Sequence, residues 1–269
     1  MEFKTQTARL MKAVHEILDP RSPARVPEGL CALAVMTKAP RAGQVKTRLS
    51  PPLTPQEAAA LNRCFLRDTT AALSVAVEGG KAKGIGVYTP AGAEDAFAEI
   101  LPPHFALVVQ RGEAFGERLI AATHDLFQLG FDSICLIDSD SPTVPLAAYF
   151  QAVAWLLHPD PRIVLGPSDD GGYYLIGLNR NQRRVFEEID WSTERVYEQT
   201  IARAAEIGVE VKLLPTWYDV DDRSTLRRLC DELLGEEIRA GSGYAAPETR
   251  SFLEAVIARE GRERIWPQA

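Results

Sequence analysis

The sequence has no long hydrophobic segment. Nowhere does an apolar run approach the roughly 20 residues that a membrane-spanning helix needs. The first 29 residues also lack the uninterrupted apolar core and the cleavage site of a secretory signal peptide. We therefore expect a cytoplasmic protein that is neither secreted nor inserted into a membrane.

Cysteine and histidine are scarce, with four of each in the chain. The cysteines show no CxxC or Cys/His spacing, and Cys31 and Cys135 lie in apolar stretches where a thiol behaves as a small hydrophobic group. No histidine adjoins a GxSxG nucleophile signature, and the GxxxxGK[ST] pattern of a P-loop is absent. The sequence thus predicts reduced core cysteines and gives no support for a hydrolase triad.

Excess positive charge is also missing. The chain carries 37 acidic and 30 basic residues, which gives a formal net charge of −7. This balance argues against a nucleic-acid binder or a membrane-surface binder. With 269 residues, of which 46% are hydrophobic, the chain is long enough for one large α/β domain or two small ones.

Short apolar strands alternate with helical segments through most of the chain. Strands without polar alternation, each followed by a helix, are typical of a mostly parallel sheet covered on both faces. We therefore predict a three-layer α/β/α fold. The expected strands are 30–37, 84–89, 105–110, 133–138 and 162–167, and the expected helices are 54–77, 92–101, 113–130 and 145–157.

The regular alternation of strand and helix ends at residue 171. An aromatic strand at 171–179 need not continue the parallel sheet, and later elements follow it. Those later elements are helical stretches at 181–188 and 194–207, a strand at 209–216 and a last helix near 247–260.

The chain divides into three predicted parts. Residues 1–29 form an N-terminal appendage, with helical spacing at 4–18 followed by prolines that interrupt regular structure. Residues 30–235 form the main domain, and residues 236–269 form a C-terminal extension.

Ligands of open parallel sheets bind beyond the carboxyl ends of the strands. The first strand leads into "TKAPRAGQVKTRLS", residues 37–50, which concentrates basic residues in an acidic chain and contains a glycine that leaves backbone N–H groups free for an anion. We predict that this loop binds a polyphosphate; a solvated basic loop is the alternative. Its candidate residues are Lys38, Arg41, Gly43, Lys46 and Arg48.

A second strand ends in "ICLIDSDSPTVP", residues 134–145. Asp138 and Asp140 are two apart, so in an extended segment both carboxylates point to one side. Carboxylates together with substrate phosphates are the ligands that Mg²⁺ or Mn²⁺ prefers. The alternative is that one of them caps the helix that begins near Thr143.

Two later segments place further acidic residues after strands. In "GPSDDGGYYLIGL", residues 166–178, Asp169 and Asp170 precede a glycine pair, a pattern that fits either a tight turn or a close approach to a ligand. In "WYDVDDRSTLRRL", residues 217–229, Asp222 is a natural N-cap, which leaves Asp219 and Asp221. Asp140 and Asp221 would complete a two-carboxylate metal site from opposite sides of a cleft.

These motifs together resemble the DUF2064 family of glycosyltransferase-like bacterial proteins, which are related to phospholactate and molybdenum-cofactor guanylyltransferases. The resemblance rests on "VMTKAPRAGQVKTRLSPPLT", "QRGEAFGERL", "IDSDSPTVP", "GPSDDGGYYLIGL", "IDWSTERV" and "WYDVDD". It implies the nucleotide-diphospho-sugar transferase (GT-A) fold, with the nucleotide across the first strands and a divalent ion on the DxD-type aspartate.

The resemblance also implies roles for individual residues. Lys38, Lys46 and Arg48 would hold phosphates. The metal would lie on Asp140 and Asp221, with Asp138 assisting and Asp219 as a further candidate ligand. Gln110, Gly112 and Arg118 would line the nucleotide or acceptor side. The acceptor side would include Asp169, Asp170, Gly171, Gly172, Trp191, Ser192 and Thr193.

Three functions are compatible with this pattern. The first is a Mg²⁺- or Mn²⁺-dependent glycosyltransferase that moves a sugar from a nucleotide sugar to a small-molecule acceptor, with Lys46, Arg48, Asp140 and Asp170 as catalytic residues. The second is a nucleotidylyltransferase that couples a nucleoside triphosphate to a phosphorylated small molecule and releases pyrophosphate. The third is a non-catalytic nucleotide-binding module.

Overall fold

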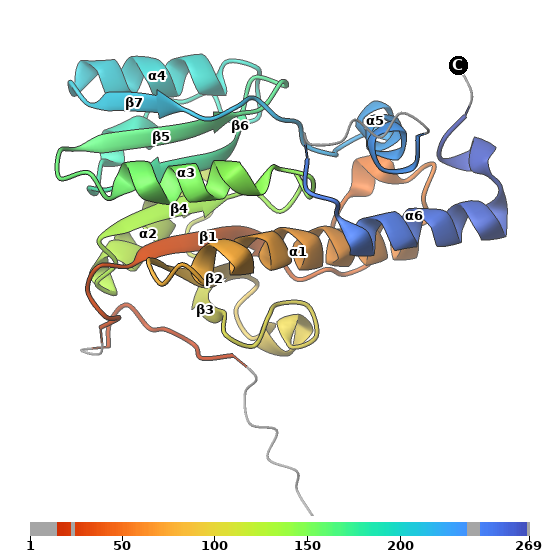
Figure 1. The fold of residues 1–269 in the computed structure, drawn as a ribbon, viewed down its shortest axis with the longest axis horizontal. Coiled ribbons are helices and arrows are strands. Elements are labelled where there is room, and N and C mark those ends of the chain that lie inside the picture. The colour runs from red at the N-terminus through yellow and green to blue at the C-terminus, as the bar shows by residue number, and fades with distance from the viewer. Residues whose placement is uncertain (1–14, 23–24, 236–242, 268–269) are drawn as a thin grey trace, which may run out of the picture.

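The computed structural model describes residues 15–22, 25–235 and 243–267. Within these ranges the chain forms a seven-stranded sheet in the order β3-β2-β1-β4-β6-β5-β7 (Figure 1). β6 is antiparallel to both of its neighbours, and the other pairings are parallel. The predicted mostly parallel sheet is therefore confirmed, and the aromatic strand after residue 171 is the one that reverses direction. The strands are β1 (Cys31–Lys38), β2 (Ala82–Thr89), β3 (Ala106–Val109), β4 (Ser133–Ile137), β5 (Arg162–Pro167), β6 (Tyr173–Leu178) and β7 (Glu210–Leu213).

Helices cover both faces of the sheet, as the three-layer prediction requires. Alternate residues of β1 enter different cores: Leu33 packs in a cluster with residues of α1 and α3, whereas Ala34 packs in a cluster with residues of α2 and α4. This alternation follows from the period of two in a strand. The helices are α1 (Pro55–Val77), α2 (Phe115–Gln128), α3 (Leu146–Leu156), α4 (Val196–Glu206), α5 (Arg223–Leu234) and α6 (Pro247–Glu260).

The start of α1 is fixed by a capping box. The Thr54 hydroxyl accepts a hydrogen bond from the Glu57 N–H at 3.2 Å, and the Glu57 carboxylate accepts one from the Thr54 N–H at 2.9 Å. These contacts satisfy backbone donors that the first turn leaves unpaired, and Pro55 needs no such partner.

A third core joins the N-terminal half of α1 to α5 and α6. Leu61 and Phe65 of α1 pack in one buried cluster with Leu229 of α5 and Leu253 of α6. The same cluster includes Val220, which lies in the loop before α5. The C-terminal helix predicted near 247–260 thus lies beside α1 (Figure 1) and helps to fix that loop. The proposed boundaries between the three parts of the chain stay a prediction.

Some predicted helices are wrong. The described end of the 4–18 helix is extended instead, because Ile17 and Leu18 pair with Leu107 and satisfy the free edge of β3. Residues 4–14 of that prediction lie outside the described residues. Of the predicted segments 92–101 and 181–188, only Glu94–Phe97 and Arg183–Phe186 form 3₁₀ turns, since such short segments cannot sustain a helix without a longer packed face.

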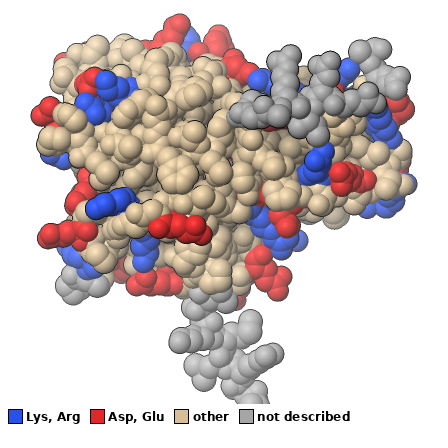
Figure 2. Space-filling model, viewed as in Figure 1, with Lys and Arg blue, Asp and Glu red and all other residues tan. Residues whose placement is uncertain are grey.

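The surface in Figure 2 carries acidic and basic side chains interspersed around its edges. Exposed apolar side chains on α3 include Phe150, at 43% exposure, and Leu157 directly after the helix. No helix in the described ranges is long and apolar enough to cross a bilayer. The four cysteines are free. Cys31 and Cys135 are buried, as their apolar context predicts, and Cys230 is buried too, whereas Cys64 is only half-buried and so departs from the predicted core position.

Candidate active site

Three loops meet at the carboxyl edge of the sheet. One follows β1, one follows β4, and the third connects β7 to α5. The Val220 N–H donates a hydrogen bond to the Asp140 carbonyl at 3.0 Å, and Ser168 pairs with Trp217 beside β5. The backbone therefore brings together the basic loop and the acidic segments that the sequence placed after separate strands.

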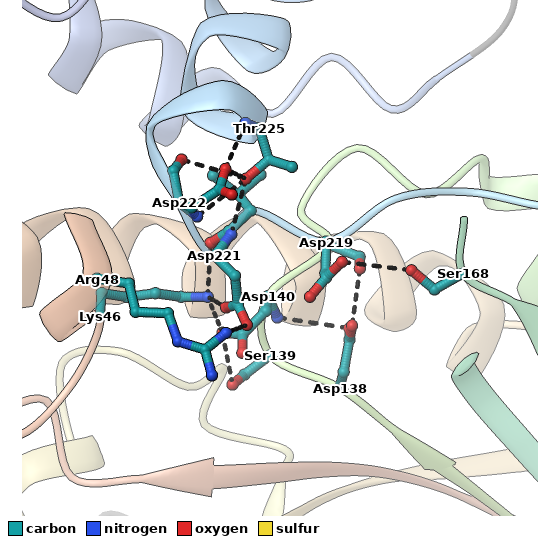
Figure 3. Close-up of polar contacts among 12 residues, drawn as sticks. Lys46, Arg48, Asp138, Ser139, Asp140, Ser168, Asp219, Asp221, Asp222 and Thr225 are labelled. Carbon is teal, nitrogen blue, oxygen red and sulfur yellow. Dashed lines mark hydrogen bonds and ion pairs between the residues drawn. The ribbon is translucent and has the colours of Figure 1, made fainter. Parts of the chain in front are cut away.

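Lys46 lies at the centre of this meeting point (Figure 3). Its ammonium nitrogen Nζ is 2.8 Å from Asp140 Oδ1, 2.9 Å from Asp221 Oδ1 and 2.8 Å from the Val220 carbonyl oxygen. The side chain is only 3% exposed. Burial alone would lower the pKa of Lys46, but the charges of Asp140 and Asp221 outweigh it and raise the pKa. Lys46 is therefore a buried, charged ammonium held by two carboxylates.

Arg48 lies on the solvent side of the same pair. Its guanidinium is 3.7 Å from Asp221 Oδ2, and the side chain is 75% exposed. A guanidinium so exposed is available to a ligand, because an ion pair of this length in solvent is weak.

Asp138 and Asp140 have different roles in the described structure. Asp138 is held by its own turn: Ser141 Oγ donates to Asp138 Oδ2 at 2.7 Å, and the Asp140 N–H donates to Asp138 Oδ1 at 3.4 Å. Burial, followed by repulsion from Asp140, raises the pKa of Asp138 well above its usual range. Only Asp140 of this motif contacts Lys46.

The aspartates of the segment 217–229 also have different roles. Asp222 caps α5 by accepting hydrogen bonds from the Ser224 and Thr225 N–H groups, each at 2.9 Å, which confirms its predicted capping role. Asp219 accepts a hydrogen bond from Ser168 Oγ at 3.3 Å. Burial, followed by repulsion from neighbouring carboxylates, raises the pKa of Asp219 to about 6.

The carboxylates at this meeting point suit a divalent ion that takes oxygen ligands from both protein and substrate. Across the described ranges, no group of three or more His, Cys, Asp or Glu side chains is arranged as a protein-only metal cage. Asp140 and Asp221, however, already converge on one cation, the Lys46 ammonium. Two such carboxylates suit Mg²⁺ or Mn²⁺ when substrate phosphates supply further ligands.

Two cavities flank this carboxylate pair. The first has a volume of about 310 Å³, and the second about 450 Å³. Arg48, Asp140 and Asp221 line both. The other residues of the first cavity are Lys38, Val45, Lys46, Thr47, Asn62 and Ser139.

Asn62 of the first cavity was not predicted from the sequence. It projects from α1, is 4% exposed, and its Oδ1 atom is buried without a hydrogen-bond partner. Buried amide oxygens are rarely left unpaired, so a donor group of a ligand or of water is expected at this position. Its place in a helix interior, far from any strand end, gave no sequence signal.

The second cavity is walled by two loops and by the start of α2. The turn between β5 and β6 contributes Ser168, Asp170 and Gly172, whereas the neighbouring Asp169 forms an ion pair with Arg228 instead. The 191–194 loop and the start of α2 contribute Trp191, Ser192, Thr193, Glu194 and Phe115. The remaining lining residues are Asp138, Tyr173, Val196 and Asp219.

Several predicted residues line neither cavity. Gln110 donates its backbone N–H to the Tyr88 carbonyl and so continues the pairing with β2. A Cβ on Gly112 would lie 2.9 Å from the Arg118 N atom, so Gly112 allows the chain to pass close to α2. The turn between β5 and β6 approaches the 191–194 loop even more closely, since a Cβ on Gly171 would lie 2.2 Å from the Glu194 carbonyl oxygen. The predicted residues outside both linings are Arg41, Gly43, Gln110, Gly112, Arg118, Asp169 and Gly171.

The sheet order and the site at its carboxyl edge define the fold of the nucleotide-diphospho-sugar transferases, as comparison with solved structures shows. A structure from Desulfovibrio desulfuricans G20, provisionally named a nucleotide-diphospho-sugar transferase, shares 30% identity at a TM-score of 0.73, over 87% of this chain and 99% of that chain. Residues 72–193 match the family "Uncharacterized protein conserved in bacteria (DUF2064)". The chain belongs to the DUF2064 family.

Two further solved structures match over most of this chain at lower sequence identity. A CMP:2-keto-3-deoxy-manno-octonic acid synthetase complexed with CTP shares 11% identity at a TM-score of 0.47, over 74% of this chain and 96% of that one. A mannosyltransferase from Pyrobaculum calidifontis in complex with GDP-Man and Mn²⁺ shares 14% identity at a TM-score of 0.43, over 88% and 77%. No curated protein matches the sequence.

Proposed function

We propose that this protein is a divalent-metal-dependent glycosyltransferase, which moves a sugar from a nucleotide-diphospho-sugar to a small-molecule acceptor. One observation carries the proposal: Arg48, Asp140 and Asp221 line both cavities. A donor whose diphosphate lies in the first cavity would therefore present its sugar carbon at the entrance to the second. The similarity to the Desulfovibrio protein supports this assignment.

The first cavity has the charge that a diphosphate requires. Lys38, Lys46 and Arg48 line it, and ammonium and guanidinium groups form strong charge-assisted hydrogen bonds with phosphate oxygens. Asn62 adds a buried amide without a partner for Oδ1. We assign this cavity to the donor's phosphates and the adjoining part of its nucleotide.

Asp140 and Asp221 would hold the divalent ion, as their convergence on one cation supports. A bound Mg²⁺ or Mn²⁺ would neutralise charge that develops on the departing diphosphate. Lys46 and Arg48 would stabilise the same charge from the protein side, because both line the first cavity.

Asp170 is the candidate general base. Unlike Asp169, which is paired with Arg228, Asp170 lines the second cavity, where its Oδ1 accepts the Gly172 N–H at 2.9 Å. In the proposed step the acceptor oxygen forms a bond with the anomeric carbon, and that carbon's bond to the phosphate oxygen breaks. The acceptor's proton passes to Asp170, and the nucleoside diphosphate leaves with the bonding electrons.

The product of the reaction distinguishes the proposal from its alternative. The protein is incubated with Mn²⁺ and either nucleotide sugars or nucleoside triphosphates, together with a mixture of small-molecule acceptors. We expect release of nucleoside diphosphate from a nucleotide sugar, and loss of this release in Asp140→Asn. Pyrophosphate release from a triphosphate, without cleavage of any nucleotide sugar, would replace sugar transfer by nucleotidyl transfer.

A further inference from the structure

The second cavity is unlike the first in both charge and shape. Resting on the proposed function, we infer that its acceptor carries no phosphate or carboxylate group, and is a hydroxyl-rich ring compound that lies against Trp191 and Phe115. A volume of about 450 Å³ suits a small molecule of this kind.

Carboxylates dominate the lining of this cavity. Among the described residues that line it, Arg48 is the sole cation, and it faces the donor cavity as well. A bound diphosphate would occupy that guanidinium, which would leave the acceptor among acidic side chains. The acidic lining residues are Asp138, Asp140, Asp170, Glu194, Asp219 and Asp221.

Two of the three nearby arginines form ion pairs away from the cavity, and the third lies behind the aromatic wall. Arg228 pairs with Asp169 and lies 3.8 Å from the centroid of the Tyr218 ring. Arg195 pairs with Asp190 at 3.0 Å, and Arg118 lies over the Phe115 ring without lining the cavity. Away from the metal-binding pair, an anionic group beside Asp170 or Glu194 would therefore meet repulsion with no cation among the described lining residues to offset it, whereas hydroxyl groups can donate hydrogen bonds to these carboxylates.

The aromatic wall gives the acceptor an apolar surface. The rings of Phe115 and Trp191 are 5.3 Å apart between centroids and inclined by 72°, and Phe115 is 46% exposed. Aromatic faces of this kind bind the apolar C–H face of a ring compound, while polar groups at the edge fix its orientation.

The position of Trp191 is fixed by the surrounding chain. A Cβ on Gly116 would lie 2.3 Å from Trp191 Nε1, so α2 approaches the indole as closely as a glycine allows. The loop itself is tied down at Asp190, whose carbonyl accepts the Thr193 hydroxyl at 2.7 Å and whose N–H donates to Gln199 at 2.7 Å. The wall is therefore formed before a ligand arrives.

Ligand-observed saturation-transfer NMR tests the inference with matched pairs of compounds. The full chain is mixed with Mg²⁺, a nucleoside diphosphate and either member of a pair: glucose and glucose 6-phosphate, mannose and mannose 6-phosphate, galactose and galacturonic acid. We expect the neutral member of a pair to bind at least about fivefold more strongly, as a like-charge penalty predicts. Preference for the anionic members, or no binding by any neutral sugar, would overturn the inference.

Three variants separate the aromatic wall from general surface effects. Trp191→Ala and Gly116→Ala are expected to weaken binding of the neutral sugar at least about tenfold, because each removes or displaces the indole. Phe150→Ala is the matched control, since Phe150 is 43% exposed and lies on α3, away from both cavities. Equal sugar binding by all three variants would exclude the wall as the acceptor site.

A further variant removes two of the carboxylates that line the second cavity. The double substitution Asp170→Asn with Glu194→Gln is expected to narrow the difference in binding affinity between each neutral sugar and its anionic counterpart. Nucleoside diphosphate binding, measured by calorimetry, should be unchanged in the Trp191→Ala protein. Failure of the acceptor inference thus leaves donor binding intact, whereas unimpaired donor cleavage by Asp140→Asn would reject the proposed function itself.

Discussion

The Lys46 ammonium nitrogen lies 2.8 Å from Asp140 Oδ1, and the lysine side chain is only 3% exposed. Asp221 holds the same nitrogen from the other side at 2.9 Å. Lys46 therefore occupies the position between the two carboxylates that a divalent ion would require. In the proposed function, metal and lysine would compete for these oxygens until a phosphate gave the ammonium another partner.

Replacing Lys46 by Met should expose this competition. Without the ammonium, Asp140 and Asp221 repel each other, so we expect Mn²⁺ to bind about tenfold or more tightly in the absence of nucleotide, and to raise the melting temperature. Cleavage of the donor should nevertheless fall about a hundredfold, because a charge that stabilises the diphosphate is lost. Mn²⁺ titration by electron paramagnetic resonance measures the affinity; an unchanged or weaker affinity contradicts the competition.

The two aspartates of the "DSD" motif should differ in their response to amide substitution. Asp140→Asn is expected to lower donor cleavage at least about a hundredfold, because it removes one of the paired carboxylates. Asp138→Asn should stay within about threefold of the unaltered protein, since its amide oxygen can still accept the Ser141 hydroxyl and the Asp140 N–H. Steady-state rates of both variants check this; equal losses would make Asp138 a direct participant.

Asn62 should show opposite effects on stability and on function. Asn62→Leu removes a buried amide whose Oδ1 has no partner, so the melting temperature should stay the same or rise. Nucleotide binding, measured by calorimetry with Mg²⁺ present, should weaken about tenfold, as expected for one lost hydrogen bond with a ligand. A large loss of stability together with normal nucleotide affinity would assign Asn62 a purely structural role.

Glu57 should make the fold sensitive to acid. Burial would raise its pKa, but hydrogen bonds from Arg264 and Thr54 outweigh this and lower it to about 2. Because the folded-state pKa is below the unfolded value, this stabilisation is complete above about pH 5 and is lost as the pH falls toward 2. Glu57→Gln should cost about 1 kcal/mol at neutral pH.

Thermal unfolding of the Glu57→Gln variant at pH 7 and pH 3 measures this effect. The difference in melting temperature from the unaltered protein should shrink at the lower pH. The exposed Glu99 provides the control, and Glu99→Gln should leave the melting temperature unchanged at both values. A difference at pH 3 as large as at pH 7 would contradict the assigned role of the Glu57 charge.

Patterns that act over a few residues made much of the fold predictable. Apolar runs and helix caps identified the strands and helices around the sheet, and the change at residue 171 marked the reversed strand β6. The position of charged residues directly after strands then predicted which loops would meet. Lys46, Asp140 and Asp221 are separated widely in sequence, yet the parallel topology brings them to one edge.

The remaining features depend on contacts that no local pattern contains. The Lys46 backbone has a left-handed conformation, with φ at 48°, where its side chain reaches the two carboxylates. The sequence gave no sign of this conformation. The partnership of Phe115 and Trp191 depends on how α2 packs against a distant loop. The failed helix at residues 15–18 shows the same dependence, because the open edge of β3 determined its conformation.

In the proposed function, Asp140 and Asp221 join the protein to a donor diphosphate through a divalent ion. Mn²⁺ titration with and without a nucleoside diphosphate, in the unaltered protein and in the Asp140→Asn/Asp221→Asn double variant, tests it most directly. We predict that the nucleotide tightens Mn²⁺ binding at least about tenfold, as two-carboxylate sites completed by phosphate require, and that the double variant loses this effect. Nucleotide binding that is independent of metal and equal in both proteins would contradict the account.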